Sequence, residues 1–434
     1  MISRLQLLFF LFSILSGPTI VAQNARPDSL ENLLKAHQTD DTLRVNLLYK
    51  IASVVYKNDS TKAMQYATEA AELSGQLNFR KGLVQSYYMM GVSLAYNKSD
   101  KEALDYFRKS LKIAEDMNYK SGIAKILIFC GISYAAIGNI PEATASYLRA
   151  VKLAEELNDQ TLLTRSLAYL SVIYTGKGDY EKALDGYQRI FRLLEKKDDK
   201  KMRASIYINI GEINKYQGNY PQALEWYQKA LSLKEEAKDE PGISLSLLNI
   251  GSIYTLQGDY EKALDYQQRA LTISEKLNNK RLVSNCYEEM GIVYLETHKP
   301  EALDYFQKAL TIVEKLSYET PIQRIVSKIG DFYRARGDYN EALANYERAL
   351  KISEELSRKR TICETGIKIG AIYYLQKKYE KALEFNLKSL ELANELKLLD
   401  NRKDIHRQLS EIYAATNDYK NAYIQHKLFT AAND

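Results

Sequence analysis

The sequence predicts an all-α solenoid of about ten helical hairpins, and three observations lead to this prediction. An alanine recurs every 40 residues along most of the chain, with one spacing of 39. A small residue precedes nearly every alanine in register, and an aromatic residue usually follows it. A fixed period in this range is typical of repeats that stack on their neighbours. The alanines stand at positions 63, 103, 143, 183, 223, 263, 302, 342, 382 and 422.

One repeat is most easily followed between residues 249 and 277. Gly251 and Tyr254 share one face of a first helix, because residues three apart lie side by side on a helix. Gly258 is expected to end that helix with a positive φ, and Asp259 to cap the next one. The second helix then presents small residues such as Ala263 to its partner. Each repeat is therefore one helical hairpin whose two helices approach closely.

The other repeats carry the same marks at the same places. The small-residue position holds Gly91, Gly131, Ser171, Gly211, Gly251, Gly291, Gly330, Gly370 and Ser410. Three residues later stand Tyr134, Tyr174, Tyr254, Tyr294, Tyr333, Tyr373 and Tyr413. Four residues after the alanine stand Phe107, Tyr147, Tyr187, Tyr227, Phe306 and Tyr346.

This pattern resembles the tetratricopeptide repeat, although each unit is longer and lacks the closing proline. The motif Asn-Ile-Gly at 209–211 and 249–251 is similar to the variant found in kinesin light chains and related adaptors. The resemblance covers residues 46–432, which we expect to form a solenoid of ten repeats. It implies a right-handed α-α superhelix whose first helices line a concave groove. It also implies a protein or peptide segment as the partner.

The N-terminal region lies outside the repeats. Residues 1–22 have a short basic start, an apolar run and a small residue at the end, which predicts a secretory signal peptide cleaved before Gln23. An uncleaved anchor is the alternative. Residues 23–45 are expected to form a capping segment over the first repeat. The protein is therefore expected to be exported to a bacterial periplasm.

The opening of the chain also resembles the periplasmic sensor regions of Bacteroidetes signalling proteins. This resemblance implies a sensing or interaction part of a membrane-linked signalling system. The alternative is a soluble periplasmic scaffold or adaptor with no signalling output. Near the C-terminus, Leu428 and Phe429 lack a following repeat to cover them. Either another protein covers them, or the native chain continues past Asp434 and links the protein to a membrane.

Composition and motifs point away from other classes of protein. The 60 basic and 55 acidic residues are nearly balanced, which gives no basic footprint for nucleic acid. The four histidines are scattered, and no catalytic, phosphate-binding or metal-binding motif is present. We therefore expect no enzyme activity, no cofactor and no metal. The three cysteines are expected to be small core residues rather than a disulfide framework.

Candidate binding residues lie on the first helices, beside the small-residue position. Asn209 and Asn249 stand two residues before it in adjacent repeats, where each amide can donate to and accept from a peptide backbone. A basic set towards the C-terminal half is suited to an acidic peptide or a carboxylate. Ordinary solvated surface residues are the alternative for both groups. The remaining candidates are Asn285, Lys215, Arg324, Lys328, Arg334 and Lys368.

The N-terminal half differs, because apolar residues occupy the equivalent groove positions. This stripe is either an apolar binding surface or is covered by the superhelix itself or by the leading segment. It consists of Met89, Phe129, Tyr169, Val92, Ile132 and Val172.

Overall fold

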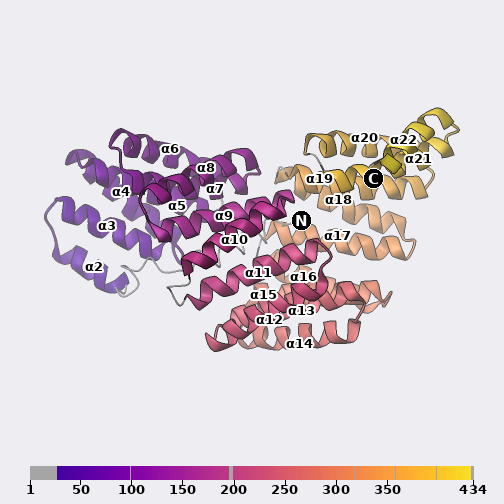
Figure 1. Cartoon of the computed structure of the whole chain (residues 1–434), viewed down its shortest axis with the longest axis horizontal. Helices are drawn as coiled ribbons and strands as arrows, with labels where there is room; N and C mark the ends of the chain where they lie inside the picture. Colours follow the sequence, from indigo (N-terminus) through magenta and orange to yellow (C-terminus); the bar gives the residue numbers. More distant parts are fainter. Residues whose placement is uncertain are drawn as a thin grey trace. The chain divides into compact units, whose positions relative to one another are not determined.

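The computed structural model describes residues 27–97, 99–194, 199–316, 318–356, 358–396 and 398–431. This part of the chain contains 21 helices and no strand, which confirms the all-α solenoid (Figure 1). The predicted signal peptide, residues 1–22, lies outside the described residues. The domain limits 1–22, 23–45 and 46–432 therefore stay predictions.

The chain divides into two compact units, which are described separately. Unit 1 extends to Leu233 and unit 2 begins at Lys234. Helix α12, Tyr220–Glu236, runs across the division. The other helices of unit 1 are α2 (Pro27–Ala36), α3 (Thr42–Val55), α4 (Ser60–Gln76), α5 (Arg80–Tyr96), α6 (Asp100–Asp116), α7 (Lys120–Ala136), α8 (Ile140–Glu156), α9 (Gln160–Lys177), α10 (Tyr180–Leu194) and α11 (Lys200–Tyr216).

Unit 2 continues the same alternation of first and second helices. Its helices are α13 (Glu240–Gln257), α14 (Tyr260–Lys276), α15 (Lys280–Glu296), α16 (Glu301–Lys315), α17 (Glu319–Ala335), α18 (Tyr339–Glu355), α19 (Lys359–Leu375), α20 (Tyr379–Glu395), α21 (Leu399–Ala415) and α22 (Tyr419–Ala431).

Each first helix packs against the second helix that follows it. In unit 1 this holds for α3–α4, α5–α6, α7–α8 and α9–α10, and in unit 2 for all five pairs from α13–α14 to α21–α22. Consecutive first helices also touch, as α3, α5, α7 and α9 do in unit 1. We call the surface that they form the first-helix face of each unit. The sequence predicts that this face is concave and binds the partner.

Glycine and an aromatic ring form the contact inside a hairpin. The repeat glycines of α5, α7, α11, α15 and α17 each face the ring that follows the repeat alanine. A Cβ atom built on any of these glycines would lie only 2.5–2.7 Å from the ring. The glycine is therefore required by close packing, because protein interiors leave no room for an added methyl group. The pairs are Gly91–Phe107, Gly131–Tyr147, Gly211–Tyr227, Gly291–Phe306 and Gly330–Tyr346.

Turn chemistry ends the helices where the sequence predicts it. Gly258 has φ 77°, and the Asp259 carboxylate accepts a hydrogen bond from the Lys262 backbone N–H at 3.2 Å. In the shortened turn, His298 takes the positive φ of 55° instead of a glycine. Ahead of the repeats, α2 packs on α3 and buries Leu30 and Leu34. Among the described helices, none is long and apolar enough to cross a bilayer.

Candidate functional site

The predicted basic set of unit 2 is largely neutralised by acids of the first-helix face. Arg324 on α17 forms a bidentate ion pair with Glu288 on α15, through Nε and through Nη2 at 2.5 Å. The Glu288 side chain is only 4% exposed, so this contact is buried on the acidic side. Burial lowers the pKa of Arg324, but Glu288 outweighs it and raises the pKa overall. The pair fastens α17 to α15.

Asp331 is the second acidic centre of unit 2. Lys368 on α19 donates to both of its oxygens at 2.9 and 3.0 Å, and the Tyr346 hydroxyl donates at 2.7 Å. Lys328 lies 3.7 Å away. Burial tends to raise the pKa of Asp331, but Lys368 and Lys328 outweigh it, so the pKa is lowered. Lys368 and Lys328, which the sequence predicts to bind a ligand, thus lie at a carboxylate of the protein itself.

The remaining predicted residues of unit 2 lie outside these ion pairs. Arg334 is exposed and acts on the Tyr346 hydroxyl, whose pKa is raised mainly by burial and by Asp331. Asn249 on α13 and Asn285 on α15 are half-buried. The predicted set is therefore not one uncompensated basic stretch, because Glu288 and Asp331 compensate its members. Ligand binding by any of these residues stays a prediction.

In unit 1, Asn209 and Lys215 do not lie free on an open surface as the sequence predicts. The Asn209 side chain is only 3% exposed and lies beside the Tyr187 hydroxyl. Lys215 donates to Glu212 at 2.8 Å, and Tyr227 donates to the same carboxylate at 2.6 Å. At this exposure Asn209 offers almost no surface to a peptide. Its role in binding remains untested, as does that of Lys215.

The apolar stripe of unit 1 is part of the packed core. All six of its residues are at most 9% exposed. The Tyr88 and Phe129 rings meet edge to face at 5.3 Å, and Tyr147 stacks on Tyr169 at 5.4 Å. Of the alternatives left open by the sequence, the structure supports coverage by the protein itself.

Arg165 on α9 is the feature of this face that the sequence reasoning missed. Its side chain is half-buried, and its Nε is fully buried without a hydrogen-bond partner. Tyrosines surround it. Tyr56 at the end of α3, Tyr88 on α5 and Tyr169 on α9 all lie close enough for its charge to oppose the rise that burial causes in their pKa values. Burial of Tyr56 raises its pKa to about 12.

A second cation approaches the same place. The Lys57 Nζ lies 5.9 Å from the centre of the Tyr56 ring. Burial lowers the pKa of Lys57, and the charge of Arg165 lowers it further. Among the described residues, no ion pair joins Arg165 to a carboxylate, and the charged groups that act on Tyr88 most strongly are tyrosines and Arg165 itself. We call Arg165, Tyr56, Tyr88 and Tyr169 the arginine–tyrosine cluster.

The cluster has the chemistry of an anion-recognition site. A guanidinium can donate two parallel hydrogen bonds to a carboxylate, and phenol hydroxyls can donate as well. Tyrosine and arginine also dominate the energetic centres of protein interfaces. A signal for Arg165 was present in the sequence, because it stands six residues before the small-residue position, as Asn285 and Arg324 do.

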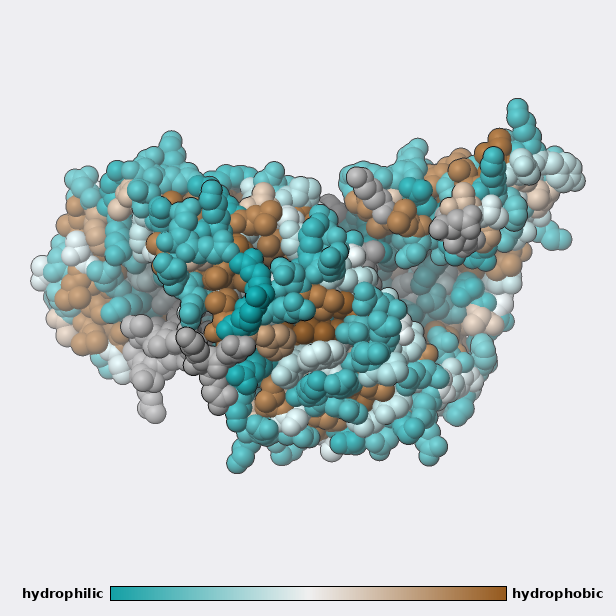
Figure 2. Space-filling model, viewed as in Figure 1, coloured by the Kyte–Doolittle hydropathy of each residue, from teal (hydrophilic) through white to brown (hydrophobic). Residues whose placement is uncertain are grey.

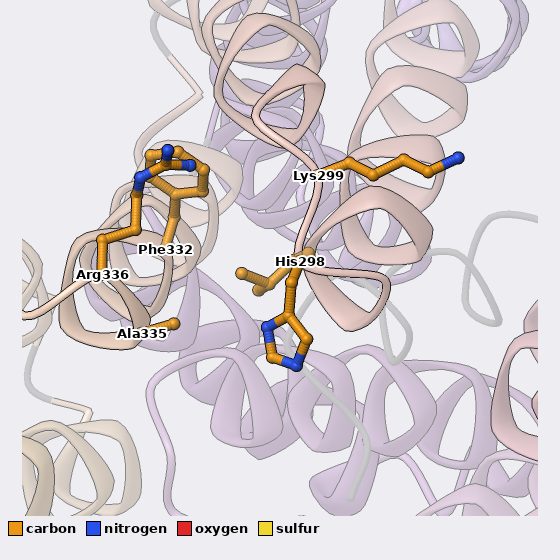
Figure 3. Close-up of a pocket in the computed structure, with 6 residues that line it drawn as sticks. His298, Lys299, Phe332, Ala335 and Arg336 are labelled. Atoms are coloured by element: carbon orange, nitrogen blue, oxygen red, sulfur yellow. The ribbon is translucent and has the colours of Figure 1, made fainter.

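A cavity at the turns of unit 2 is a weaker candidate. It encloses about 420 Å³ between residues such as Leu295, His298 and Arg336. Figure 3 shows that the Lys299 side chain points away from Arg336, whose guanidinium lies 5.0 Å from the centre of the Phe332 ring. The cationic groups do not converge on one point. In the described part of the chain, no group of His, Cys, Asp or Glu is arranged to hold a metal ion.

The fold and these faces define a class: an α-solenoid whose stacked hairpins present long surfaces to other molecules. Two family models described as tetratricopeptide repeat match the chain, one at residues 162–236, 242–315 and 322–395, the other at residues 84–117. The matches cover more than half of the sequence. The chain belongs to the tetratricopeptide repeat family. None of the curated proteins compared with it by sequence is significantly similar to it.

Solved structures share the fold at low sequence identity. The apo quorum sensor NprR from Bacillus thuringiensis is 16% identical, with a TM-score of 0.60 over 80% of this chain and 97% of that one. Aspartyl phosphate phosphatase F from Bacillus subtilis is 15% identical, with a TM-score of 0.56 over 81% and 95%. A Pyrococcus horikoshii signal transduction ATPase with a tetratricopeptide repeat sensor is 18% identical, with a TM-score of 0.50 over 85% and 55%.

Proposed function

We propose that the protein binds a peptide or protein segment on the first-helix face of unit 1, and that an acidic group of this segment pairs with Arg165. The observation that carries the proposal is the buried Arg165 Nε, which has no partner among the described residues. An unsatisfied buried donor costs free energy, about 1–3 kcal/mol for a typical group. A carboxylate that pairs with the half-buried Arg165 guanidinium neutralises its charge, which no carboxylate of the described residues does.

The tetratricopeptide family supports the same class of function, since its solenoids are typically interaction scaffolds rather than enzymes. Two of the proteins with a similar fold are named as sensors, one of them a quorum sensor. This is an argument by analogy from fold to function. It supports a setting in signalling. The finer proposal, that this chain is the sensing part of a membrane-linked bacterial system, rests on the resemblance of its opening to periplasmic sensor regions. A soluble periplasmic scaffold is the second candidate, and the expected signal peptide is compatible with both.

A peptide-display selection against the full mature chain tests the binding proposal. We expect selected peptides to be enriched in Asp and Glu, and to lose about 10- to 100-fold in affinity on Arg165→Gln, as for a partly buried ion pair. Lys125→Gln is the matched control, because Lys125 occupies the same repeat position on α7 but is exposed. Peptides without acidic residues, or equal affinity for both variants, would contradict the proposal.

A separate measurement is needed to decide between the membrane-linked sensor and the soluble periplasmic scaffold. The intact mass of the native protein, taken from membrane and soluble fractions of its own cells, distinguishes the two candidates. A heavier, membrane-bound species supports the signalling role. A soluble species that begins at Gln23 and ends near Asp434 supports the scaffold.

A further inference from the structure

The last hairpin departs from the others on its outer surface. In each second helix, the second and sixth residues after the repeat alanine point outward, and we call them the outer pair. Six hairpins place an acid and a base there. These pairs are Asp105–Lys109, Asp185–Arg189, Glu225–Lys229, Asp265–Arg269, Asp304–Lys308 and Glu384–Lys388. Every other hairpin except the last keeps a charge at the sixth position. Helix α22 instead carries Ile424 and Leu428.

In three of these six hairpins the two residues of the outer pair form an ion pair with each other. Lys229 donates to Glu225 at 2.6 Å, and Lys388 donates to Glu384 at 2.7 Å. Such i, i+4 pairs are exposed and contribute only a few tenths of a kcal/mol each, about 0.3–0.5. Their main effect is to keep this surface hydrated. The apolar pair of α22 has no charges to keep this surface hydrated, although Ile424 is 43% and Leu428 is 44% exposed.

Stacking of a further hairpin does not account for the change. The α21–α22 hairpin packs on α20, yet it leaves Glu384 and Lys388 56% and 68% exposed. Because the repeat geometry is constant, a hairpin stacked on α22 would leave Ile424 and Leu428 equally uncovered. An apolar pair at this position therefore indicates contact with a different kind of molecule.

The surroundings of the pair define the chemistry of that molecule. Lys420, Ile424 and Leu428 follow one another at intervals of four residues and so form one row on the helix. Lys427 stands in the neighbouring row. The described residues of α22 include no aspartate or glutamate. The surface is thus an apolar strip bordered by lysines.

From this surface we infer a second binding site: the outer face of α22 docks an amphipathic helix of a partner protein, whose apolar stripe is flanked by acidic residues. The partner's carboxylates match Lys420 and Lys427, and its apolar stripe covers Ile424 and Leu428. A second copy of this chain fits less well, because its α22 would bring the same lysines. A lipid surface also fits less well, because the strip has few apolar side chains for insertion.

The test uses two labelled helical peptides with the same leucine stripe, one flanked by glutamates and the other by lysines. Their binding to the full mature chain is followed by fluorescence anisotropy. We expect the glutamate peptide to bind at least ten times more tightly than the lysine peptide. Ile424→Glu with Leu428→Lys, which restores the charged pair of α20, is expected to weaken the glutamate peptide at least tenfold.

Two further variants keep the test decisive. Lys420→Ser with Lys427→Ser leaves the apolar strip intact and is also expected to lose the glutamate peptide. Arg165→Gln is expected to leave this binding unchanged, which separates the site from the one proposed on unit 1. Equal binding of both peptides, or no effect of Ile424→Glu with Leu428→Lys, overturns the inference. So does a change of oligomeric state in sedimentation velocity, or loss of binding to phosphatidylglycerol vesicles, caused by those substitutions.

Discussion

Ser171 and Gly186 face each other across the fourth hairpin in reversed order of size, with the glycine on the second helix and the larger residue on the first. Ser171 stands on α9 where most repeats have glycine, and Gly186 stands opposite on α10. A Cβ atom built on Gly186 would lie 2.0 Å from the Ser171 Oγ. The fourth hairpin therefore preserves the close approach of its helices with the small residue on the other side of the contact.

This relationship predicts a compensating pair of substitutions. Gly186→Ala should destabilise the protein by about 1–3 kcal/mol, as overpacking of a full core does. Ser171→Gly with Gly186→Ala should recover most of that loss, because the serine oxygen is then absent. Urea unfolding of the two single variants and the double variant measures the coupling free energy. Additive effects of the two substitutions would show that these residues do not constrain each other.

The glycines that face aromatic rings allow a second prediction, in which two identical substitutions have opposite effects. Gly131→Ala should lower stability by about 1–3 kcal/mol, because its Cβ would lie 2.5 Å from the Tyr147 ring. Gly176→Ala in the same unit should raise stability by about 0.5–1 kcal/mol. Gly176 is helical, and nothing lies within 4 Å of its Cβ position. Thermal unfolding of both variants checks the signs, and a loss of stability in both would contradict the packing argument.

The hairpins were predictable from the sequence because periodic small residues directly mark helix contacts. Gly131 and Tyr147 illustrate this, since the spacing that revealed them is also the spacing that brings them together. The ion pairs were not predictable in this way. Residues 40 apart were treated as neighbours on adjacent first helices. In the structure, Lys368 meets Asp331, although the position equivalent to Asp331 is Ala371. The partner stands three residues earlier, about one helical turn.

The same offset of three residues explains the ion pair between Arg324 and Glu288 in unit 2. Ser327 is equivalent to Glu288, and Arg324 precedes Ser327 by three residues. This offset depends on how first helices lean against each other, which a single sequence does not specify. The burial of Asn209 was not predicted either, because α11 is covered on most of its faces: Ile208 and Ile210 on either side of it are buried as well.

Asp331 gives a prediction with a defined pH dependence. Its pKa lies below the ordinary 3.8 because Lys368 and Lys328 outweigh burial. A carboxyl group whose pKa is lowered by folding contributes stability above its unfolded pKa and loses it as pH falls through the folded value. Asp331→Asn should therefore cost about 1–3 kcal/mol at pH 7 and progressively less below about pH 4, where the wild type also loses the ion pair.

Urea unfolding between pH 2 and pH 7 measures this difference. Asp304→Asn is a suitable control, because Asp304 is an exposed acid of the outer pair on α16. It should change stability by less than about 0.5 kcal/mol at any pH. A constant difference between the wild type and Asp331→Asn across the range would mean that the carboxylate charge contributes nothing.

Arg165 leads to the last prediction, which separates its charge from its geometry. Arg165→Lys keeps the positive charge but loses the planar fork that pairs with a carboxylate. For an acidic peptide selected on the wild type, we expect an affinity loss of about 3- to 10-fold for Arg165→Lys and about 10- to 100-fold for Arg165→Gln. The wild type should also show the steepest weakening as salt is raised, and Arg165→Gln the shallowest. Because Arg165 has no carboxylate partner among the described residues, neither substitution should lower the free energy of unfolding by more than about 1 kcal/mol. Isothermal titration calorimetry at two salt concentrations measures the affinities and their dependence on salt.

Equal losses of affinity for the two variants would mean that the planar fork is essential and that the charge alone contributes nothing. A large loss of stability would instead make Arg165 a structural residue of the cluster.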